Sequence, residues 1–263
     1  MRAPDLHVVE AGEGPAVVLL HGLTATGRYV VHGSRALERA GHRVIAYDAR
    51  GHGASAPAPD GVYDYAALAD DLRDTLDERG VERAVLAGAS MGAHTLLRLA
   101  LTDPGRVAGL VVITPAHHQD AERDLARWDR LSAGLRAGGV DGFVAAYGEP
   151  GVPAQWKDTV VKVLHQRLSH HEHPEAVADA LQQVPRSEPF ASTDDLAGLP
   201  DVPTLIVADR DEADPGHPLW VGEAYAAAIP GARLVVEDEG ASPIAWQGGQ
   251  LSKLIAAVAA EAR

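Results

Sequence analysis

The sequence predicts an α/β fold, in which a mostly parallel sheet is flanked by helices and carries an inserted helical cap. Two observations support this prediction. Short apolar stretches typical of buried strands alternate with longer helical patterns, which favours parallel strands joined by helices. The alternation stops between residues 116 and 189, where the chain is helical and polar. We therefore expect a core domain of residues 1–115 and 190–263, and a helical cap of residues 116–189.

The predicted core elements follow one another along the chain. Gly41 and Gly80 are expected to end the first two helices, because glycine readily adopts the left-handed conformation found there. Within the predicted cap, Gly134, Gly138 and Pro174 interrupt the helical pattern. Strands are expected at residues 6–9, 16–20, 43–47, 84–87, 108–114, 203–208 and 233–236, and helices at residues 29–40, 65–79, 91–101 and 246–261.

Composition limits the size and the partners of the protein. A chain of 263 residues with 46% hydrophobic and 23% charged residues can form one domain with an insertion. Its net charge of -14 argues against nucleic acids and anionic membranes as partners. The first residues lack the apolar run of a signal peptide, and no apolar stretch is long enough to span a bilayer. We therefore expect a cytoplasmic protein.

The chain contains no cysteine. Disulfides, thiolate metal sites and cysteine-based catalysis are therefore excluded. The histidines at positions 165, 170, 171 and 173 are irregularly spaced and lack a pattern of accompanying carboxylates. We interpret them as a solvated surface of the cap and expect neither a metal nor a cofactor.

The motif Gly88-Ala89-Ser90-Met91-Gly92 has the form G-x-S-x-G and lies between a predicted strand and a predicted helix. Ser90 is a candidate nucleophile, because a serine at this sharp turn stands above the carboxyl end of the strand. Glycines are needed on both sides since side chains there would clash across the turn. The backbone N–H of Met91 then faces developing negative charge at the start of the helix.

Two further motifs follow predicted strands. They are His21-Gly22-Leu23 and Asp48-Ala49-Arg50-Gly51-His52-Gly53-Ala54-Ser55. Together with the serine motif, they resemble the α/β-hydrolase superfamily, and in particular its capped members such as esterases, lactonases and carbon–carbon bond hydrolases. The resemblance covers nearly the whole chain except the predicted cap. It implies that the backbone N–H groups of Leu23 and Met91 form an oxyanion hole.

The polar side chains of these loops have a structural interpretation. We expect His21, Asp48, Arg50 and His52 to brace the loops by hydrogen bonds, because buried polar groups near turns need partners. His94, one helical turn beyond Ser90, is expected to pack against the core. None of these five residues is assigned a chemical role.

The resemblance also implies a carboxylate after the strand at residues 203–208. The family pattern G-x-x-D falls on Asp211, with Ala208 at the glycine position, while Asp209 and Asp214 are competing candidates. A carboxylate is required because the catalytic base must be held in one tautomer and stabilised once it accepts the serine proton.

The histidine that the family carries after the last strand is missing. Gly240-Ala241-Ser242-Pro243 stands there, so Ala241 occupies the position of the base, and no histidine follows His217. Without a base, a serine hydroxyl is a weak nucleophile at neutral pH. The sequence therefore predicts a protein that binds substrate but scarcely turns it over.

Three explanations for Ala241 are open. An engineered His-to-Ala substitution would account for the otherwise intact motifs. A natural pseudoenzyme would use the scaffold to bind a ligand without catalysis. A relocated base is the third, with His117 and His118 as the best candidates because they lie at the start of the predicted cap.

The expected function is that of a serine hydrolase acting through an acyl-enzyme on Ser90, most simply a carboxylic ester hydrolase of the esterase or lactonase kind. Carbon–carbon bond and amide hydrolysis are alternatives, whereas epoxide hydrolases and haloalkane dehalogenases place aspartate at the serine position. The partner is a small molecule with an acyl group. Aromatic residues of the cap that could line its pocket are Trp128, Phe143, Tyr147 and Trp156.

Overall fold

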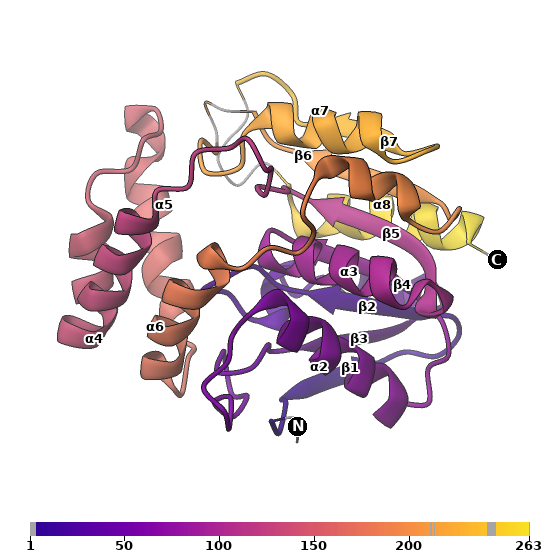
Figure 1. Cartoon of the computed structure of the whole chain (residues 1–263), viewed down its shortest axis with the longest axis horizontal. Coiled ribbons are helices and arrows are strands. Elements are labelled where there is room, and N and C mark those ends of the chain that lie inside the picture. Colours follow the sequence, from indigo (N-terminus) through magenta and orange to yellow (C-terminus); the bar gives the residue numbers. More distant parts are fainter. Residues whose placement is uncertain (1–3, 211, 213, 241–245, 263) are drawn as a thin grey trace.

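In the computed structural model, seven strands form one sheet in the order β1-β3-β2-β4-β5-β6-β7 (Figure 1). The structure describes residues 4–210, 212, 214–240 and 246–262. The strands are β1 (Val8–Ala11), β2 (Ala16–Leu20), β3 (Arg43–Tyr47), β4 (Ala84–Ala89), β5 (Val107–Ile113), β6 (Thr204–Ala208) and β7 (Arg233–Val236). Only β1 runs antiparallel to its neighbour β3, so the predicted mostly parallel sheet is confirmed.

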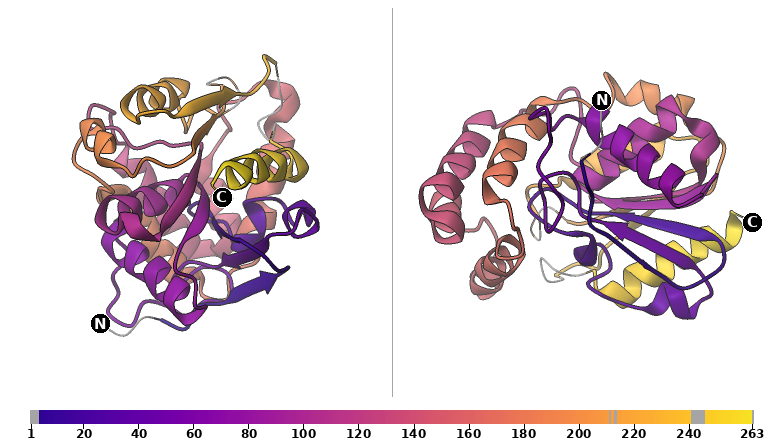
Figure 2. Two further views of the ribbon diagram at one scale, coloured as in Figure 1. Left: turned by 90° about the vertical axis from the view of Figure 1, so that its right-hand side faces the viewer. Right: turned by 90° about the horizontal axis from the view of Figure 1, so that it is seen from below.

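Helices cover both faces of the sheet. Successive strand residues point to opposite faces, so Val18 and Leu86 belong to one buried cluster while Val17 and Val85 belong to the other. Helices α2 (Tyr65–Glu78), α3 (Met91–Thr102) and α7 (Leu219–Ala228) pack on the first face. Helices α1 (Ala36–Arg39) and α8 (Gly248–Glu261) pack on the second (Figure 2). Both faces are therefore apolar, as expected for a parallel sheet.

One predicted helix was wrong and one observed helix was missed. Instead of one helix over residues 29–40, the chain forms a 3₁₀ helix (Gly27–Tyr29) and the four-residue α1. Positive φ angles at His32 (48°) and Gly33 (72°) break the helix between them. Helix α7 was not predicted. It contains a single charged residue, Glu223, and therefore lacks the polar face that marks an amphipathic helix.

Three further helices lie beyond the carboxyl ends of the parallel strands (Figure 1). They are α4 (Leu125–Tyr147), α5 (Ala154–Leu168) and α6 (Pro174–Gln183), and we call them together the three-helix segment. Gly138 and Gly139 have non-helical backbone angles inside α4. The three helices share an apolar cluster that includes Leu131, Leu164 and Val177. The three-helix segment thus lies at the carboxyl ends of the strands, where open α/β folds bind ligands.

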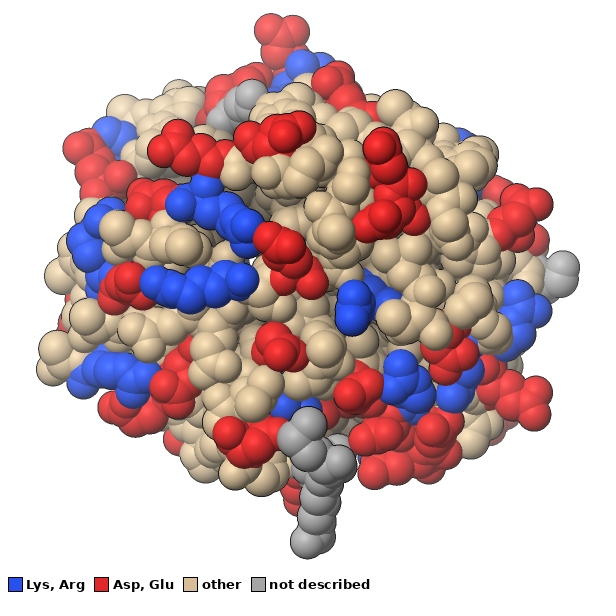
Figure 3. Space-filling model, viewed as in Figure 1, with Lys and Arg blue, Asp and Glu red and all other residues tan. Residues whose placement is uncertain are grey.

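Charged side chains on the face seen in Figure 3 are mixed, with basic groups interspersed among acidic ones. In the described part of the chain, no helix combines the length and the apolar character needed to cross a bilayer.

Candidate active site

Ser90 occupies a strained turn between β4 and α3. Its backbone angles are φ 49° and ψ −111°, a conformation that non-glycine residues rarely adopt. A Cβ on Gly88 would lie 2.5 Å from the carbonyl carbon of Gly92, and a Cβ on Gly92 would lie 2.2 Å from the carbonyl oxygen of Leu20. The predicted steric need for both glycines is thus confirmed.

A chain of hydrogen bonds leads away from Ser90. The Ser90 hydroxyl lies 2.8 Å from Nε2 of His217, and Nδ1 of His217 lies 2.7 Å from Oδ2 of Asp214. Because Nδ1–H donates to the carboxylate, Nε2 is left free to accept the serine proton. The three side chains thus have the geometry of a nucleophile, a base and an orienting acid.

A tight turn after β6 holds Asp214 and His217 together. The backbone N–H of His217 donates to the carbonyl of Asp214 over 3.0 Å, and the N–H of Gly216 donates to Oδ1 of Asp214 over 3.2 Å. The intervening Pro215 and Gly216 are favoured in such turns. Asp214-Pro215-Gly216-His217 is therefore a short sequence motif that aligns a carboxylate with an imidazole.

This arrangement differs from the sequence-based expectation. Asp211 and Ala241, expected to be the acid and the position of the base, lie outside the described residues. The described residue that reaches Ser90 is His217, which the sequence analysis did not consider as a base, and Asp214 was only a competing candidate for the acid. The signal that could have revealed both was the short Asp-Pro-Gly-His motif in the segment that follows the buried strand β6.

The two histidines proposed as relocated bases have other partners. Nε2 of His117 lies 3.2 Å from the carbonyl oxygen of Phe190, and Nδ1 of His118 accepts a hydrogen bond from the backbone N–H of Asp120 over 3.1 Å. Neither is hydrogen-bonded to Ser90 in the described structure. His94 is buried, as expected, and hydrogen-bonds to Tyr65.

Electrostatics favour a charged pair at this site. Burial opposes the charged form of His217, but the Asp214 carboxylate outweighs it and raises the pKa of His217 above its ordinary value. Burial likewise opposes ionisation of Asp214, yet His217 and its hydrogen bonds lower the Asp214 pKa. Asp209 behaves differently, because burial together with the nearby Asp214 and Glu237 charges raises its pKa to about 7.

The loop of His21, Gly22 and Leu23 lies against the serine turn. A Cβ on Gly22 would lie 3.4 Å from the carbonyl oxygen of Ala89 and 3.5 Å from Cβ of Ser90. Leu23 and Met91 both line the space around Ser90. Their backbone N–H groups remain our candidates for the oxyanion hole.

Buried hydrogen bonds brace this loop and its neighbour, as predicted. Nε2 of His21 accepts from the backbone N–H of Ala49 over 2.8 Å, and Asp48 Oδ1 accepts from the N–H of Gly27 over 2.8 Å. Arg50 makes a bidentate pair with Asp71, with distances of 2.7 and 2.8 Å. Nδ1 of His52 lies 3.0 Å from the carbonyl oxygen of Arg50.

His171, one of the four histidines interpreted as part of a solvated surface, instead hydrogen-bonds to loops of the core. Nδ1 of His171 accepts from the backbone N–H of Gly53 over 2.8 Å, and its Nε2 donates to the carbonyl of Thr24 over 3.0 Å. It thereby links the three-helix segment to the loops beside Ser90. In the described residues, no group of histidine, aspartate and glutamate side chains could hold a metal ion.

Two cavities meet at Ser90. The larger has a volume of about 290 Å³ and includes Tyr65, Met91 and Trp128 in its lining. The smaller, of about 210 Å³, includes Asp214, His217 and Arg167. Both are lined by Ser90 and Leu23. The serine therefore lies where two parts of one substrate could bind on either side of the reacting bond.

Of the four aromatic residues proposed to line a pocket, Trp128 lines the larger cavity. Phe143 is buried in the apolar cluster of the three-helix segment. Tyr147 belongs to the edge of that cluster, and Arg127 lies 5.2 Å from its ring. Phe143, Tyr147 and Trp156 are not among the residues that line either cavity.

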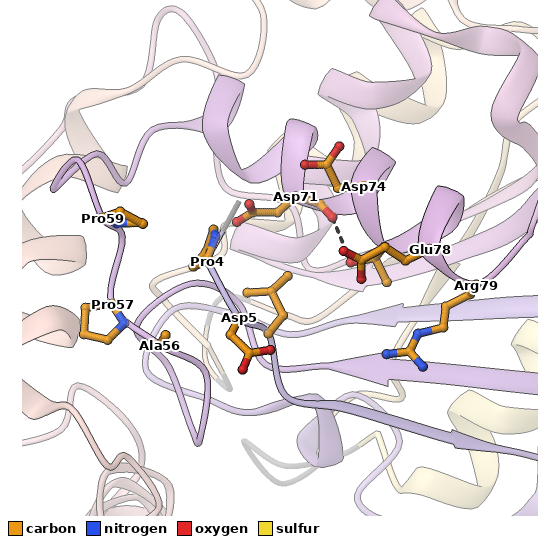
Figure 4. Close-up of a pocket in the computed structure, with 11 residues that line it drawn as sticks. Pro4, Asp5, Ala56, Pro57, Pro59, Asp71, Asp74, Glu78 and Arg79 are labelled. Atoms are coloured by element: carbon orange, nitrogen blue, oxygen red, sulfur yellow. Dashed lines mark hydrogen bonds between the residues drawn. The ribbon is translucent and has the colours of Figure 1, made fainter. Parts of the chain in front are cut away.

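A cavity of about 830 Å³ lies elsewhere, between α2 and the N-terminal segment (Figure 4). Its lining includes the carboxylates of Asp5, Asp71, Asp74 and Glu78 together with Arg79. Ser90 and His217 are not part of it. It therefore has no share in the chemistry of the serine site.

Known proteins share this architecture and this sequence pattern. The sequence model of the family "alpha/beta hydrolase fold" matches residues 15–247. The "Putative carbamate hydrolase RutD" of Variovorax paradoxus is 33% identical over 202 residues, which are 76% of this chain and 75% of that protein.

Solved structures agree. A hydrolase from Pseudomonas aeruginosa superimposes with a TM-score of 0.76 and 27% identity, covering 98% of this chain and 94% of that one. A thermophilic esterase from Thermogutta terrifontis, solved with malate bound, gives a TM-score of 0.75 and 27% identity over 98% and 91% of the two chains. The serine turn, the sheet and these similarities lead to one conclusion: the chain belongs to the α/β-hydrolase family.

Proposed function

We propose that this protein is a serine hydrolase of carboxylic esters and lactones, with Ser90 as nucleophile, His217 as general base and Asp214 as the acid that orients it. The observation that carries the proposal is the continuous hydrogen-bonded chain from Ser90 through His217 to Asp214. On this proposal the chain is competent with alanine at position 241, because another histidine supplies the base.

In the first half of the reaction, Ser90 Oγ attacks the acyl carbon while its proton passes to Nε2 of His217. The imidazolium is stabilised by Asp214, and the oxyanion faces the N–H groups of Leu23 and Met91. As the bond between the acyl carbon and the leaving oxygen breaks, His217 returns the proton to that oxygen. The products are an alcohol and an acyl-enzyme.

In the second half, water enters the vacated position and gives its proton to His217. The resulting hydroxide attacks the acyl carbon, and the proton returns to Ser90 Oγ as the carboxylic acid leaves. Each step uses the same imidazole in alternating roles. The raised pKa of His217 suits it to accept and return protons near neutral pH.

Relatives support ester-type chemistry. The Thermogutta terrifontis protein is an esterase, and a further structure with 25% identity and a TM-score of 0.71 is described as an N-acyl homoserine lactone degrading enzyme. The name of the Variovorax paradoxus relative points to carbamates, whose carbonyl carbon could be attacked in the same way. A carbamate ester therefore belongs in the substrate panel.

The test compares the unsubstituted chain with Ser90→Ala, His217→Ala, His117→Ala and Ala241→His. We expect the unsubstituted chain to hydrolyse activated short-chain esters and to be labelled on Ser90 by an organophosphonate. Turnover should fall on the order of 10⁴- to 10⁶-fold in Ser90→Ala and His217→Ala, and should change little in His117→Ala.

Two results would overturn the proposal. If the unsubstituted chain is inactive and Ala241→His is active, the base belongs at position 241 and this chain is an inactivated form. If His117→Ala abolishes activity while His217→Ala retains it, the base is His117.

A further inference from the structure

Arg167 introduces a positive charge into the smaller cavity beside Ser90. It lies one residue before the end of α5 and lines that cavity together with Ser90 and His217. Among the described residues, its guanidinium makes one hydrogen bond, from Nη2 to the hydroxyl of Thr24 over 3.2 Å. Its Nε is buried and has no hydrogen-bond partner in the part of the chain that the structure describes.

No carboxylate forms an ion pair with Arg167 in the described part of the chain. Arg136 of the same three-helix segment provides a contrast, since its guanidinium pairs with both Glu175 and Asp179. Holding a guanidinium largely out of water without an ion-pair partner costs free energy, and a charged group placed this way in a cavity is a candidate for ligand binding. Burial lowers the pKa of Arg167, but arginine remains protonated at neutral pH.

Neither of the two described carboxyl groups in the cavity lining forms an ion pair with Arg167, although the charge of Asp214 favours the protonated guanidinium. Asp214 instead accepts hydrogen bonds from His217 and from the backbone N–H of Gly216. Asp209, whose pKa is raised to about 7 chiefly by burial, carries only part of a negative charge at neutral pH. The cavity is therefore lined by a cation whose Nη1 makes no hydrogen bond or ion pair to another described residue.

We infer that Arg167 binds a carboxylate of the substrate, so that the preferred substrates are esters or lactones that carry a second, free carboxylate group. The inference rests on the proposed hydrolase function and identifies the substrate class of the same site. A planar guanidinium suits this role because it can donate two parallel hydrogen bonds to a carboxylate. Since the smaller cavity starts at Ser90, the bound carboxylate would hold the acyl carbon within reach of the nucleophile.

The hydrogen bond to Thr24 suggests a second role for Arg167, that of positioning a loop, and an experiment must distinguish it from carboxylate binding. Thr24 directly follows the loop of His21, Gly22 and Leu23, so Arg167 could act by positioning that loop. Loss of a positioning residue would slow all substrates alike. Loss of a carboxylate-binding residue would slow only the anionic ones.

The experiment uses 4-nitrophenyl hemisuccinate and 4-nitrophenyl butyrate, which share a leaving group and differ in the terminal carboxylate. We expect Arg167→Gln to lower kcat/KM for the hemisuccinate by about 10- to 100-fold, mainly through KM, and to leave the butyrate within about threefold. Arg167→Lys should lie between. Lys162→Gln removes an exposed positive charge from the same helix and should behave as the unsubstituted chain.

Equal losses on both esters in Arg167→Gln, or no loss on either, would overturn the inference. A separate arm measures binding of succinate to the Ser90→Ala protein by calorimetry, which requires no turnover. If the unsubstituted chain hydrolyses neither ester, the proposed function fails, yet succinate binding that depends on Arg167 would still support the anion site. Failure of succinate to bind Ser90→Ala, with both esters hydrolysed equally well by the unsubstituted chain, would reject the anion site alone.

Discussion

The hydroxyl of Tyr65 lies 2.9 Å from Nδ1 of His94, and both residues are buried. Nε2 of His94 accepts hydrogen bonds from the backbone N–H groups of Ala116 and His117, over 3.1 and 3.2 Å. The proton of the neutral ring is therefore on Nδ1, which donates to the Tyr65 oxygen. This pair fastens the chain after β5 to helices α2 and α3 at the edge of the larger cavity.

The first prediction concerns the stability that this pair supplies. Tyr65→Phe should lower the free energy of unfolding by about 1–3 kcal/mol, because Nδ1–H of His94 would be left buried without an acceptor. Urea unfolding measures this difference. Tyr147→Phe is the matched control, since the Tyr147 hydroxyl has no hydrogen bond among the described residues. Equal stability of the two variants would contradict the assigned tautomer.

The pH dependence of kcat/KM should report the protonation of His217. The base must be neutral to accept the serine proton, and the net effect of Asp214 against burial raises its pKa above 6.5. We therefore expect kcat/KM to fall as pH decreases, with an apparent pKa above 6.5. In Asp214→Asn the remaining activity should be low and its acid limb should move to lower pH. An acid limb that is the same in both proteins would remove Asp214 from the site.

The charge of Asp209 should affect the acid limb of the pH–activity profile, but Asp209 should not be essential for activity. Its charge is one of those that raise the pKa of His217, so Asp209→Asn should move the acid limb to lower pH while retaining most of the maximal rate. Kinetics from pH 5 to 9 measure the shift, with Asp238→Asn as an exposed control that removes the same charge. A loss of maximal rate comparable to that of Asp214→Asn would make Asp209 the acid instead.

Gly92 should tolerate no side chain. In Gly92→Ala the new Cβ would lie 2.2 Å from the carbonyl oxygen of Leu20, so the serine turn must shift. We expect a loss of stability of about 1–3 kcal/mol together with loss of activity. Gly249→Ala is the control, because a Cβ there meets nothing within 4 Å and alanine favours the helix. Thermal unfolding and ester hydrolysis of both variants decide the point, and an active, stable Gly92→Ala protein would contradict the turn geometry.

A fall in pH should destabilise the hydrogen bonds by which His171 joins the three-helix segment to the core. Burial is the main cause that lowers the pKa of His171 to about 4, so the folded state binds fewer protons than the unfolded state below pH 6.5. Stability contributed by this group is therefore complete above pH 6.5 and is lost as the pH falls towards 4.

Between pH 7 and pH 5 this loss amounts to about 2 kcal/mol for one such histidine. His171→Asn should flatten the pH dependence of the unfolding free energy by that amount relative to the control variant His170→Asn, which changes an exposed neighbouring histidine. Unfolding in urea at both pH values measures the difference. An equal slope in the unsubstituted chain and His171→Asn would show that this imidazole is not held neutral.

Most of the sheet and the serine turn could be predicted from the sequence because the determining interactions are local. Strands β2, β3 and β7 have the predicted bounds, because each is a short run rich in apolar and β-branched residues. The glycines at 88 and 92 follow from steric contact across five residues. Helix α7 and the break at His32 could not be predicted, because the first is stabilised by packing on the sheet and the second by an unusual backbone angle.

The sequence by itself determined the family and the strained turn that carries Ser90. Only the tertiary structure decided which histidine meets Ser90, because β4 and β6 are separated by β5 in the sheet and the two residues are 127 positions apart in the chain. Both strands run parallel and end at the same edge, so the turn after β6 reaches the serine after β4. Arg167 meets Thr24 across 143 positions for a similar reason, since α5 lies over that edge. Local sequence patterns do not specify contacts between residues so far apart in the chain, because these contacts follow only from the packing of the whole chain.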